Sequence, residues 1–209
     1  MKTGVFGGTF DPLHIGHLIL AEEAQAQLRL DRVLWVLTQY PPHKKQQAIT
    51  PVELRLQMVQ AAIQDNPSFA LSRVDIDRLP PHYAIDTLRL LTQAFPNTEW
   101  IYLMGEDSLR DLPTWHTPHE LVAICAGFGV MKRPNNPLDL DALEDKLPGV
   151  TNKIQWIDAP LIDISASGIR RRICQGEPFQ YFLPPEVYRI IQEHQLYRSA
   201  ECRSQPSKH

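Results

Sequence analysis

Residues 7–17 read Gly7-Gly8-Thr9-Phe10-Asp11-Pro12-Leu13-His14-Ile15-Gly16-His17, and they decide how the rest of the chain is interpreted. The stretch follows an apolar run predicted as a strand, residues 3–6, and leads into a strong helix former, residues 16–28. A glycine-rich turn between a strand and a helix directs backbone N–H groups and the positive end of the helix dipole at one point, which favours an anion. His14 and His17 share one face if the helix begins near residue 14. The stretch therefore predicts a pocket for a polyphosphate.

Sequence patterns and composition exclude several kinds of protein. The chain has neither the P-loop pattern G-x-x-x-x-G-K-[ST] nor the dinucleotide-binding pattern G-x-G-x-x-G. Its net charge of −3 gives no basic field for nucleic acid, and no apolar run reaches the roughly 18–20 residues of a membrane span. The three cysteines are widely spaced and predict neither a disulfide framework nor a zinc site. We therefore expect a cytoplasmic protein without nucleic-acid or membrane partners.

Apolar runs alternate with helical patterns along the chain. After the first strand and helix, strands are expected at 32–37, 69–76, 100–104, 128–131 and 153–157. Helices are expected at 52–64, 86–95, 118–126, 167–174 and 185–194, with a short helix within 134–149. Residues 50–53, Thr-Pro-Val-Glu, predict a capping box at the start of the second helix. This alternation indicates an α/β fold with a doubly wound parallel sheet, which binds ligands along one edge.

The length of 209 residues suits one α/β domain. We expect residues 1–198 to form that single domain. Residues 199–209 have almost nothing to bury and are predicted to be a disordered tail.

The pattern Gly-Gly-Thr-Phe-Asp-Pro-x-His-x-Gly-His closely resembles the signature of the nucleotidylyltransferases. Among these, the chain is most similar to the bacterial nicotinate mononucleotide adenylyltransferases, from residue 2 to about residue 198. The resemblance implies a Rossmann-like nucleotidylyltransferase fold. It also implies transfer of AMP from ATP to nicotinate mononucleotide, which gives nicotinic acid adenine dinucleotide and pyrophosphate in NAD biosynthesis. Mg²⁺ is expected to bind through the ATP phosphates, and no residue is predicted as a metal ligand.

Two further segments are expected beside ATP. Gly105-Glu106-Asp107-Ser108-Leu109 resembles the family's Gly-x-Asp-Ser-Leu, and its carboxylate suits a ribose hydroxyl or the cap of a helix. Residues 164–170 resemble the family's Ile-Ser-x-Thr-x-Ile-Arg on the ATP phosphates, and alone they also fit a capped helix with a surface arginine. The predicted ATP-binding residues are Gly7, Gly8, Phe10, His14, His17, Gly105, Asp107, Arg133, Ser165, Ser167 and Arg170.

The acceptor nucleotide is expected beside a basic loop and two aromatic segments. Pro41-Pro42-His43-Lys44 resembles the family's loop on substrate phosphate, and alone it also fits a solvated basic loop. In the family, a tryptophan corresponding to Trp115 stacks on the nicotinate ring, and backbone N–H groups near it and at a Tyr-Thr pair meet the carboxylate. The predicted nicotinate mononucleotide-binding residues are Thr9, His43, Lys44, Tyr83, Ala84, Trp115 and His116.

The expected chemistry is direct adenylyl transfer, in which both reactants bring their own charge and no protein nucleophile is needed. Catalysis then consists of positioning and of stabilising charge in the transition state. We expect His14, His17 and Arg170 around the triphosphate and Lys44 near the acceptor phosphate as the catalytic residues. Asp11 is expected to hold the turn and not a metal.

The chain departs from the family pattern at Thr38, where Asn is common, at Ala84 and Ser167, where the family has Thr, and at Gly168 inside a helix. Phosphopantetheine adenylyltransferases and cytidylyltransferases share the His-x-Gly-His turn and remain alternatives. A class I aminoacyl-tRNA synthetase also shares it, but this chain is short and lacks a Lys-Met-Ser-Lys-Ser loop. A further alternative is a nucleotide-binding protein without turnover.

Overall fold

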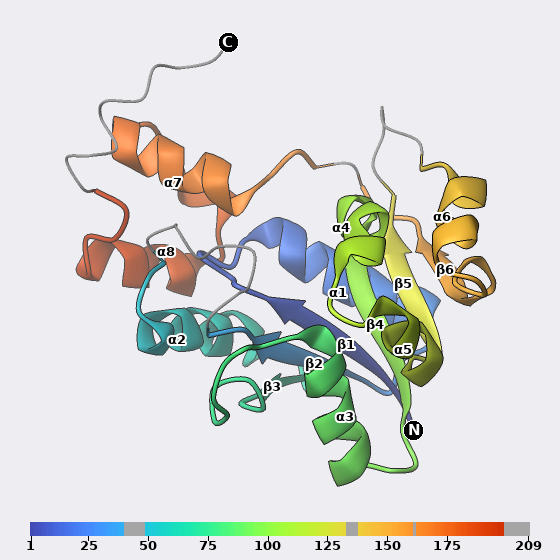
Figure 1. The fold of residues 1–209 in the computed structure, drawn as a ribbon. Coiled ribbons are helices and arrows are strands. Elements are labelled where there is room, and N and C mark those ends of the chain that lie inside the picture. The colour runs from blue at the N-terminus through green and yellow to red at the C-terminus, as the bar shows by residue number, and fades with distance from the viewer. Residues whose placement is uncertain (40–48, 133–137, 161, 199–209) are drawn as a thin grey trace.

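The computed structural model describes residues 1–39, 49–132, 138–160 and 162–198. In this part of the chain, six parallel strands form one sheet in the order β3-β2-β1-β4-β5-β6 (Figure 1). The strands are β1 (Lys2–Gly8), β2 (Arg32–Leu37), β3 (Phe69–Ser72), β4 (Glu99–Gly105), β5 (Gly127–Met131) and β6 (Ile154–Ile157). The chain builds outward from β1 in one direction and then in the other. The predicted doubly wound sheet is therefore confirmed, and its topological switch point lies between β1 and β4.

Helices cover both faces of this sheet (Figure 1). On one face pack α1 (Ile15–Gln27) and α2 (Val52–Ile63). On the other face pack α3 (Ala84–Ala94), α4 (Glu106–Asp111), α5 (Pro118–Ile124) and α6 (Leu140–Lys146). In the described ranges, no helix combines the length and the apolar composition needed to cross a bilayer.

The strands are buried on both faces because consecutive apolar side chains alternate between two cores. In β2, Val36 points into the core with α3, whereas Trp35 points into the core with α1 and α2. In β4, Tyr102 points into the core with α3, and Leu103 points into the core with α1 and α2. The unbroken apolar run at 32–37 gives both ends of β2 correctly.

The last two helices, α7 (Ala166–Gln175) and α8 (Pro185–Glu193), pack beyond the sheet. They share a third hydrophobic cluster with Met58 of α2. Ile169 of α7 and Val187 of α8 are among its buried side chains. Consequently the last described helix, α8, lies beside α2, far along the chain from it (Figure 1).

Two predictions of local structure are wrong, and one short helix was not predicted. The third strand ends at Ser72 and not at residue 76, because the backbone turns there and the N–H groups of Ile76 and Asp77 bond the Arg73 carbonyl. Helix α2 has Pro51 as its N-cap without a side-chain hydrogen bond, so the predicted capping box does not form. The short helix α4 was not predicted. The predicted tail, residues 199–209, lies outside the described residues.

Candidate active site

A cavity of about 680 Å³ opens at the switch point, where β1 and β4 end. His14, Gly16 and His17 of the signature turn line one side, and the start of α4 lines another. A third side is formed by the segment that leads into α7. Of the predicted ATP-binding residues, those that line this cavity are Gly7, His14, His17, Gly105, Asp107 and Ser165.

The two signature histidines form a stacked pair at the start of α1. Their ring centroids are 3.7 Å apart at an interplanar angle of 28°. The backbone N–H of His14 donates to Nδ1 of His17 over 3.2 Å. Because Nδ1 of His17 accepts this bond, a neutral His17 carries its proton on Nε2.

His14 is buried, and burial lowers its pKa from 6.5 to about 4. Within the described residues, Nδ1 of His14 has no hydrogen-bond partner. A buried polar nitrogen without a partner is costly unless a ligand or water satisfies it. The imidazole is therefore neutral at pH 7 in this structure, and it lines this cavity at the N-cap of α1.

The side chain of Phe10, a predicted ATP-binding residue, is packed in the core and lines neither of the two cavities described here. Phe10 is 2% exposed, and its ring meets the His17 ring edge-on, with centroids 5.2 Å apart. Its backbone is left-handed, with φ of 46°, a conformation that is costly for a residue with a Cβ. A Cβ on Gly8 would lie 2.7 Å from the Phe10 ring, so glycine at position 8 makes room for this phenylalanine. Gly8 itself lines a second cavity and not the first.

The second cavity has about 270 Å³ and lies beside the first. The two share Gly7, Tyr102, Ser108 and Trp115 in their linings. Of the predicted acceptor-binding residues, those that line the second cavity are Thr9, Tyr83, Ala84, Trp115 and His116. Two cavities with a common wall can hold two ligands whose reactive ends meet.

Aromatic rings surround this second cavity. Trp115 meets the ring of Tyr102 edge-on, with centroids 5.8 Å apart. Tyr83 and His116 stack on each other at 4.1 Å and 24°. A flat ligand ring can therefore find an aromatic face in this cavity. Ala84 is the first residue of α3, so the N-terminus of an 11-residue helix also borders the cavity.

Asp11 connects the signature turn to distant parts of the chain. Its carboxylate accepts from the Thr50 N–H over 3.2 Å and from the Tyr197 hydroxyl over 2.6 Å. Its backbone carbonyl accepts from Nη1 of Arg170 over 2.7 Å. The interpretation of Asp11 as a residue that holds the turn fits these contacts.

Arg170 was predicted among the ligands of the triphosphate, but the structure places it behind the turn. It does not line either of the two cavities, and its hydrogen bond to the Asp11 carbonyl supports the backbone of the turn. Ser167 also lies outside these linings. Its neighbour Ser165 caps α7 by accepting from the Gly168 N–H over 3.1 Å.

Sequence reasoning missed a buried arginine under the same turn. Arg55 of α2 is 1% exposed and donates to the backbone carbonyls of Thr9, Thr38 and Gln39 at 2.9–3.1 Å. It also reaches the Thr50 carbonyl. One guanidinium thus holds together the loops that follow β1 and β2. The sequence signal that could have revealed it is an arginine among the apolar residues on one face of a predicted helix.

Three predicted site residues, His43, Lys44 and Arg133, lie outside the described residues. In the part of the chain that the structure describes, no three His, Cys, Asp or Glu side chains form a metal-binding group. The carboxylate of Asp11 accepts hydrogen bonds from Thr50 and Tyr197.

Comparisons with known proteins agree with this geometry. The cytidylyltransferase-like family profile matches residues 5–172. A protein of Thermomicrobium roseum named "Probable nicotinate-nucleotide adenylyltransferase" is 45% identical over 201 residues, covering 96% of this chain and 94% of that protein. A protein of Bacillus pumilus with the same name is 38% identical, covering 95% of this chain and 99% of that protein.

Among solved structures, the fold is similar to the nicotinic acid mononucleotide adenylyltransferase of Plasmodium falciparum in complex with NaAD. The TM-score is 0.78 at 18% sequence identity, over 94% of this chain and 97% of that one. At this identity the likeness shows the fold alone. The family profile and the relatives together establish that the chain belongs to the cytidylyltransferase-like nucleotidylyltransferases and, within them, to the nicotinate-nucleotide adenylyltransferase family.

Proposed function

We propose that the protein transfers AMP from ATP to nicotinate mononucleotide, giving nicotinic acid adenine dinucleotide and pyrophosphate. The observation that carries the proposal is the pair of adjoining cavities with Trp115 and Tyr102 in their common wall. ATP occupies the larger cavity, which the two histidines line. The mononucleotide occupies the smaller one, which the aromatic rings line. The names of the relatives support the proposed reaction.

The reaction joins a phosphate oxygen of the mononucleotide to the α-phosphorus of ATP and breaks the bond to pyrophosphate. The protein supplies position and charge stabilisation. His17 donates from Nε2 to the triphosphate, and His14 contributes its partnerless Nδ1 once a phosphate is near. Phe10 fixes the ring of His17, and the Asp11 contacts to Arg170 and Tyr197 fix the backbone of the turn.

The binding assignments extend to the remaining predicted residues. Gly7, Gly105, Asp107 and Ser165 contact ATP, and the residues that contact the mononucleotide are Thr9, Tyr83, Ala84, Trp115 and His116. His43, Lys44 and Arg133 stay predictions that rest on the sequence. Mg²⁺ binds through the phosphates and, when bound, neutralises part of their charge. A cytoplasmic location also stays a prediction.

Pyrophosphate release tests the proposal directly. The purified protein is given ATP, Mg²⁺ and one acceptor at a time: nicotinate mononucleotide, nicotinamide mononucleotide, phosphopantetheine or, with CTP, a phosphosugar. We expect release with the pyridine mononucleotides alone, together with formation of the dinucleotide. Release only with another acceptor would identify one of the related nucleotidylyltransferases, and nucleotide binding without release would identify a binding protein.

A further inference from the structure

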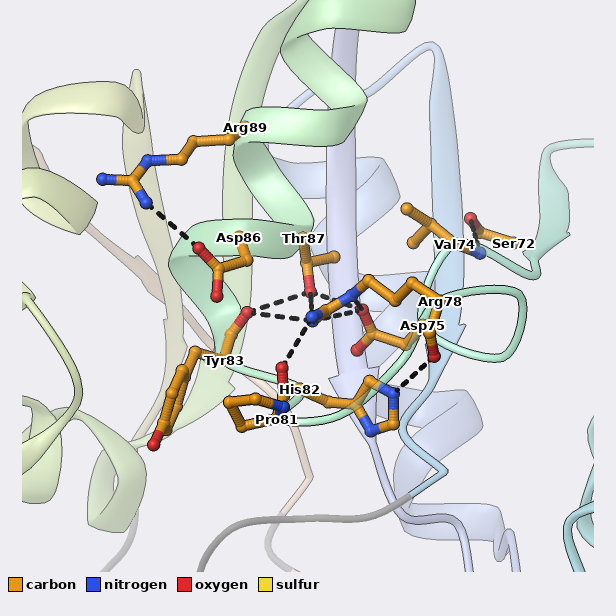
Figure 2. A network of polar contacts seen from close by, with 10 residues as sticks. All are labelled: Ser72, Val74, Asp75, Arg78, Pro81, His82, Tyr83, Asp86, Thr87 and Arg89. Atoms are coloured by element: carbon orange, nitrogen blue, oxygen red, sulfur yellow. Dashed lines mark hydrogen bonds and ion pairs between the residues drawn. The ribbon is translucent and has the colours of Figure 1, made fainter.

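A network of polar contacts closes the loop between β3 and α3 (Figure 2). Oδ1 of Asp75 accepts from Nε of Arg78 over 3.0 Å and from the Thr87 hydroxyl over 2.7 Å. Nη1 of Arg78 donates to the Pro81 carbonyl over 2.7 Å, and Nη2 of Arg78 lies 3.3 Å from the Tyr83 carbonyl. Three residues of the loop and the first turn of α3, Pro81, Tyr83 and Thr87, are thus connected to one ion pair.

The Asp75–Arg78 ion pair is withdrawn from solvent. Its shortest N···O distance is 2.9 Å, and the two side chains are 4% and 16% exposed for Asp75 and Arg78. A second pair on the same loop, Arg73 with Asp77, is more than half exposed. Charges that are buried are screened far less than exposed ones, so only the first pair acts strongly on a neighbouring site.

The buried pair borders the smaller cavity. Asp75, His82, Tyr83 and Thr87 all line it. Tyr102 lines the same cavity as Asp75, and its pKa is raised first by burial and further by the charge of Asp75. A buried carboxylate in the wall of a cavity that is to receive an anionic ring would repel it unless a cation neutralised it.

The same network directs a backbone donor toward this cavity. The Tyr83 carbonyl accepts from the N–H groups of Asp86 and Thr87 and from the Thr87 hydroxyl. In a trans peptide the carbonyl and the following N–H point in opposite directions. The Ala84 N–H therefore points out of the helix end that borders the cavity.

We infer that the Asp75–Arg78 ion pair determines the preference of this site for an acidic pyridine ring over its neutral amide, with Arg78 cancelling the charge of Asp75 and fixing the Ala84 N–H. This inference rests on the proposed function. The pair acts on the ligand through the wall and the helix end, so both residues are positioning and specificity-determining residues and not catalytic ones.

Charge and geometry give different signatures. A unit charge acting over about 10 Å at an effective permittivity near 20 changes an equilibrium about tenfold. Arg78→Gln leaves Asp75 unneutralised and should lower the ratio of kcat/KM for nicotinate to that for nicotinamide mononucleotide by about three- to tenfold. Asp75→Asn leaves a net cation and should raise the same ratio by a similar factor. Structural damage alone would lower kcat/KM for both mononucleotides, but it would not shift their ratio downward in one variant and upward in the other.

The experiment measures kcat/KM for both mononucleotides in the two variants, in the double variant and in two controls. The double variant removes both charges and should return the ratio to near the unmutated value. Thr87→Val removes the hydroxyl that donates to Asp75 and to the Tyr83 carbonyl without changing charge, so it should lower kcat/KM for both substrates and move their ratio far less than the two charge changes do. Asp77→Asn, in the exposed pair on the same loop, should change neither quantity.

Circular dichroism and melting temperature identify variants that fail to fold, and Arg78→Lys then serves as the conservative replacement, expected to keep the ratio. Shifts of the ratio in opposite directions support the inference. Equal shifts in one direction, or none in folded variants, overturn it while leaving the proposed function intact. If the unmutated protein adenylylates neither mononucleotide, the proposed function itself fails.

Discussion

The hydroxyl of Tyr197 donates a 2.6 Å hydrogen bond to Oδ1 of Asp11, joining the end of the described chain to the signature turn. Burial raises the pKa of Tyr197, and the charge of Asp11 raises it further, so the phenol stays a donor across the physiological range. Asp11 is 5% exposed and begins the turn that carries His14. The C-terminal end of the described chain thereby supports the signature turn.

Tyr197→Phe should lower both stability and activity. Loss of a hydrogen bond to a buried carboxylate costs about 1.5–3 kcal/mol, or about 3–10 °C of melting temperature for a chain of this size. The turn would then hold the histidines less firmly, so kcat should fall several-fold. Tyr181→Phe is the matched control, because Tyr181 is 86% exposed. Unchanged melting and turnover in Tyr197→Phe would show that the bond has no role.

Deleting residues 199–209 should give a contrasting result. The sequence of this segment offers little to bury, so we expect the melting temperature and kcat to change by no more than the measurement error. The deletion leaves Tyr197 in place. A loss of several degrees would instead mean that the segment contributes contacts of its own.

His14 makes stability depend on pH. Its pKa is lowered by burial to about 4, against 6.5 in the unfolded chain. Between these values the unfolded chain binds a proton that the native protein does not, so this residue's contribution is full above pH 6.5 and lost as pH falls toward 4. The loss is about 3 kcal/mol at most. Urea unfolding between pH 4.5 and 7 should show a smaller pH dependence for His14→Gln, and parallel curves would contradict the assignment.

Local sequence patterns predicted the scaffold well. Continuous apolar runs located β2 and β4, because a strand buried on both faces has no polar positions that could be confused with a loop. The third strand was predicted to be too long, because Val74 and Ile76 continue the alternating apolar pattern. In the structure the strand has already ended, and Asp75 forms an ion pair with Arg78. An ion pair between residues three apart in a loop has no periodic signature.

Several predicted site residues line the two cavities, whereas the residues that support the turn through hydrogen bonds were harder to recognise from sequence. His14, His17 and Trp115 line the cavities as expected, because a motif specifies the residues that face a ligand. Arg170 and Arg55 instead bond backbone carbonyls of the turn and its neighbours. Sequence could not separate an arginine that meets phosphate from one that meets a carbonyl, because both acceptors suit the same donor group.

His17→Ala should lower kcat by on the order of 10²–10³, the usual cost of losing one transition-state donor. The Nε2 proton of His17 is the lost donor, and Phe10 would also lose its edge-on partner. The measurement is kcat with saturating ATP and nicotinate mononucleotide, with circular dichroism to confirm folding. His119→Ala, an exposed histidine on α5, is the control. Turnover near that of the unmutated protein would remove His17 from the mechanism.

Substrate preference gives the last prediction. Trp115 offers an aromatic face that cannot distinguish nicotinate from nicotinamide, because the two rings are nearly isosteric. Selection must come from the exocyclic group, where backbone N–H donors such as that of Ala84 suit a carboxylate that only accepts. An amide would turn its own NH₂ toward one donor and lose a charge-assisted hydrogen bond, worth about 1.5–3 kcal/mol. We therefore expect at least about tenfold higher kcat/KM for nicotinate mononucleotide.

Trp115→Ala separates ring binding from this selection. Removing the aromatic face should lower kcat/KM for both mononucleotides by about tenfold or more while leaving their ratio much less affected. Trp115→Phe retains a flat face and should recover most of the loss. The ring of Trp115 packs edge-on against Tyr102, so melting curves are needed to show that the variants keep the wall intact. Equal kcat/KM for acid and amide in the unmutated protein would mean that the N-terminus of α3 does not read the exocyclic group.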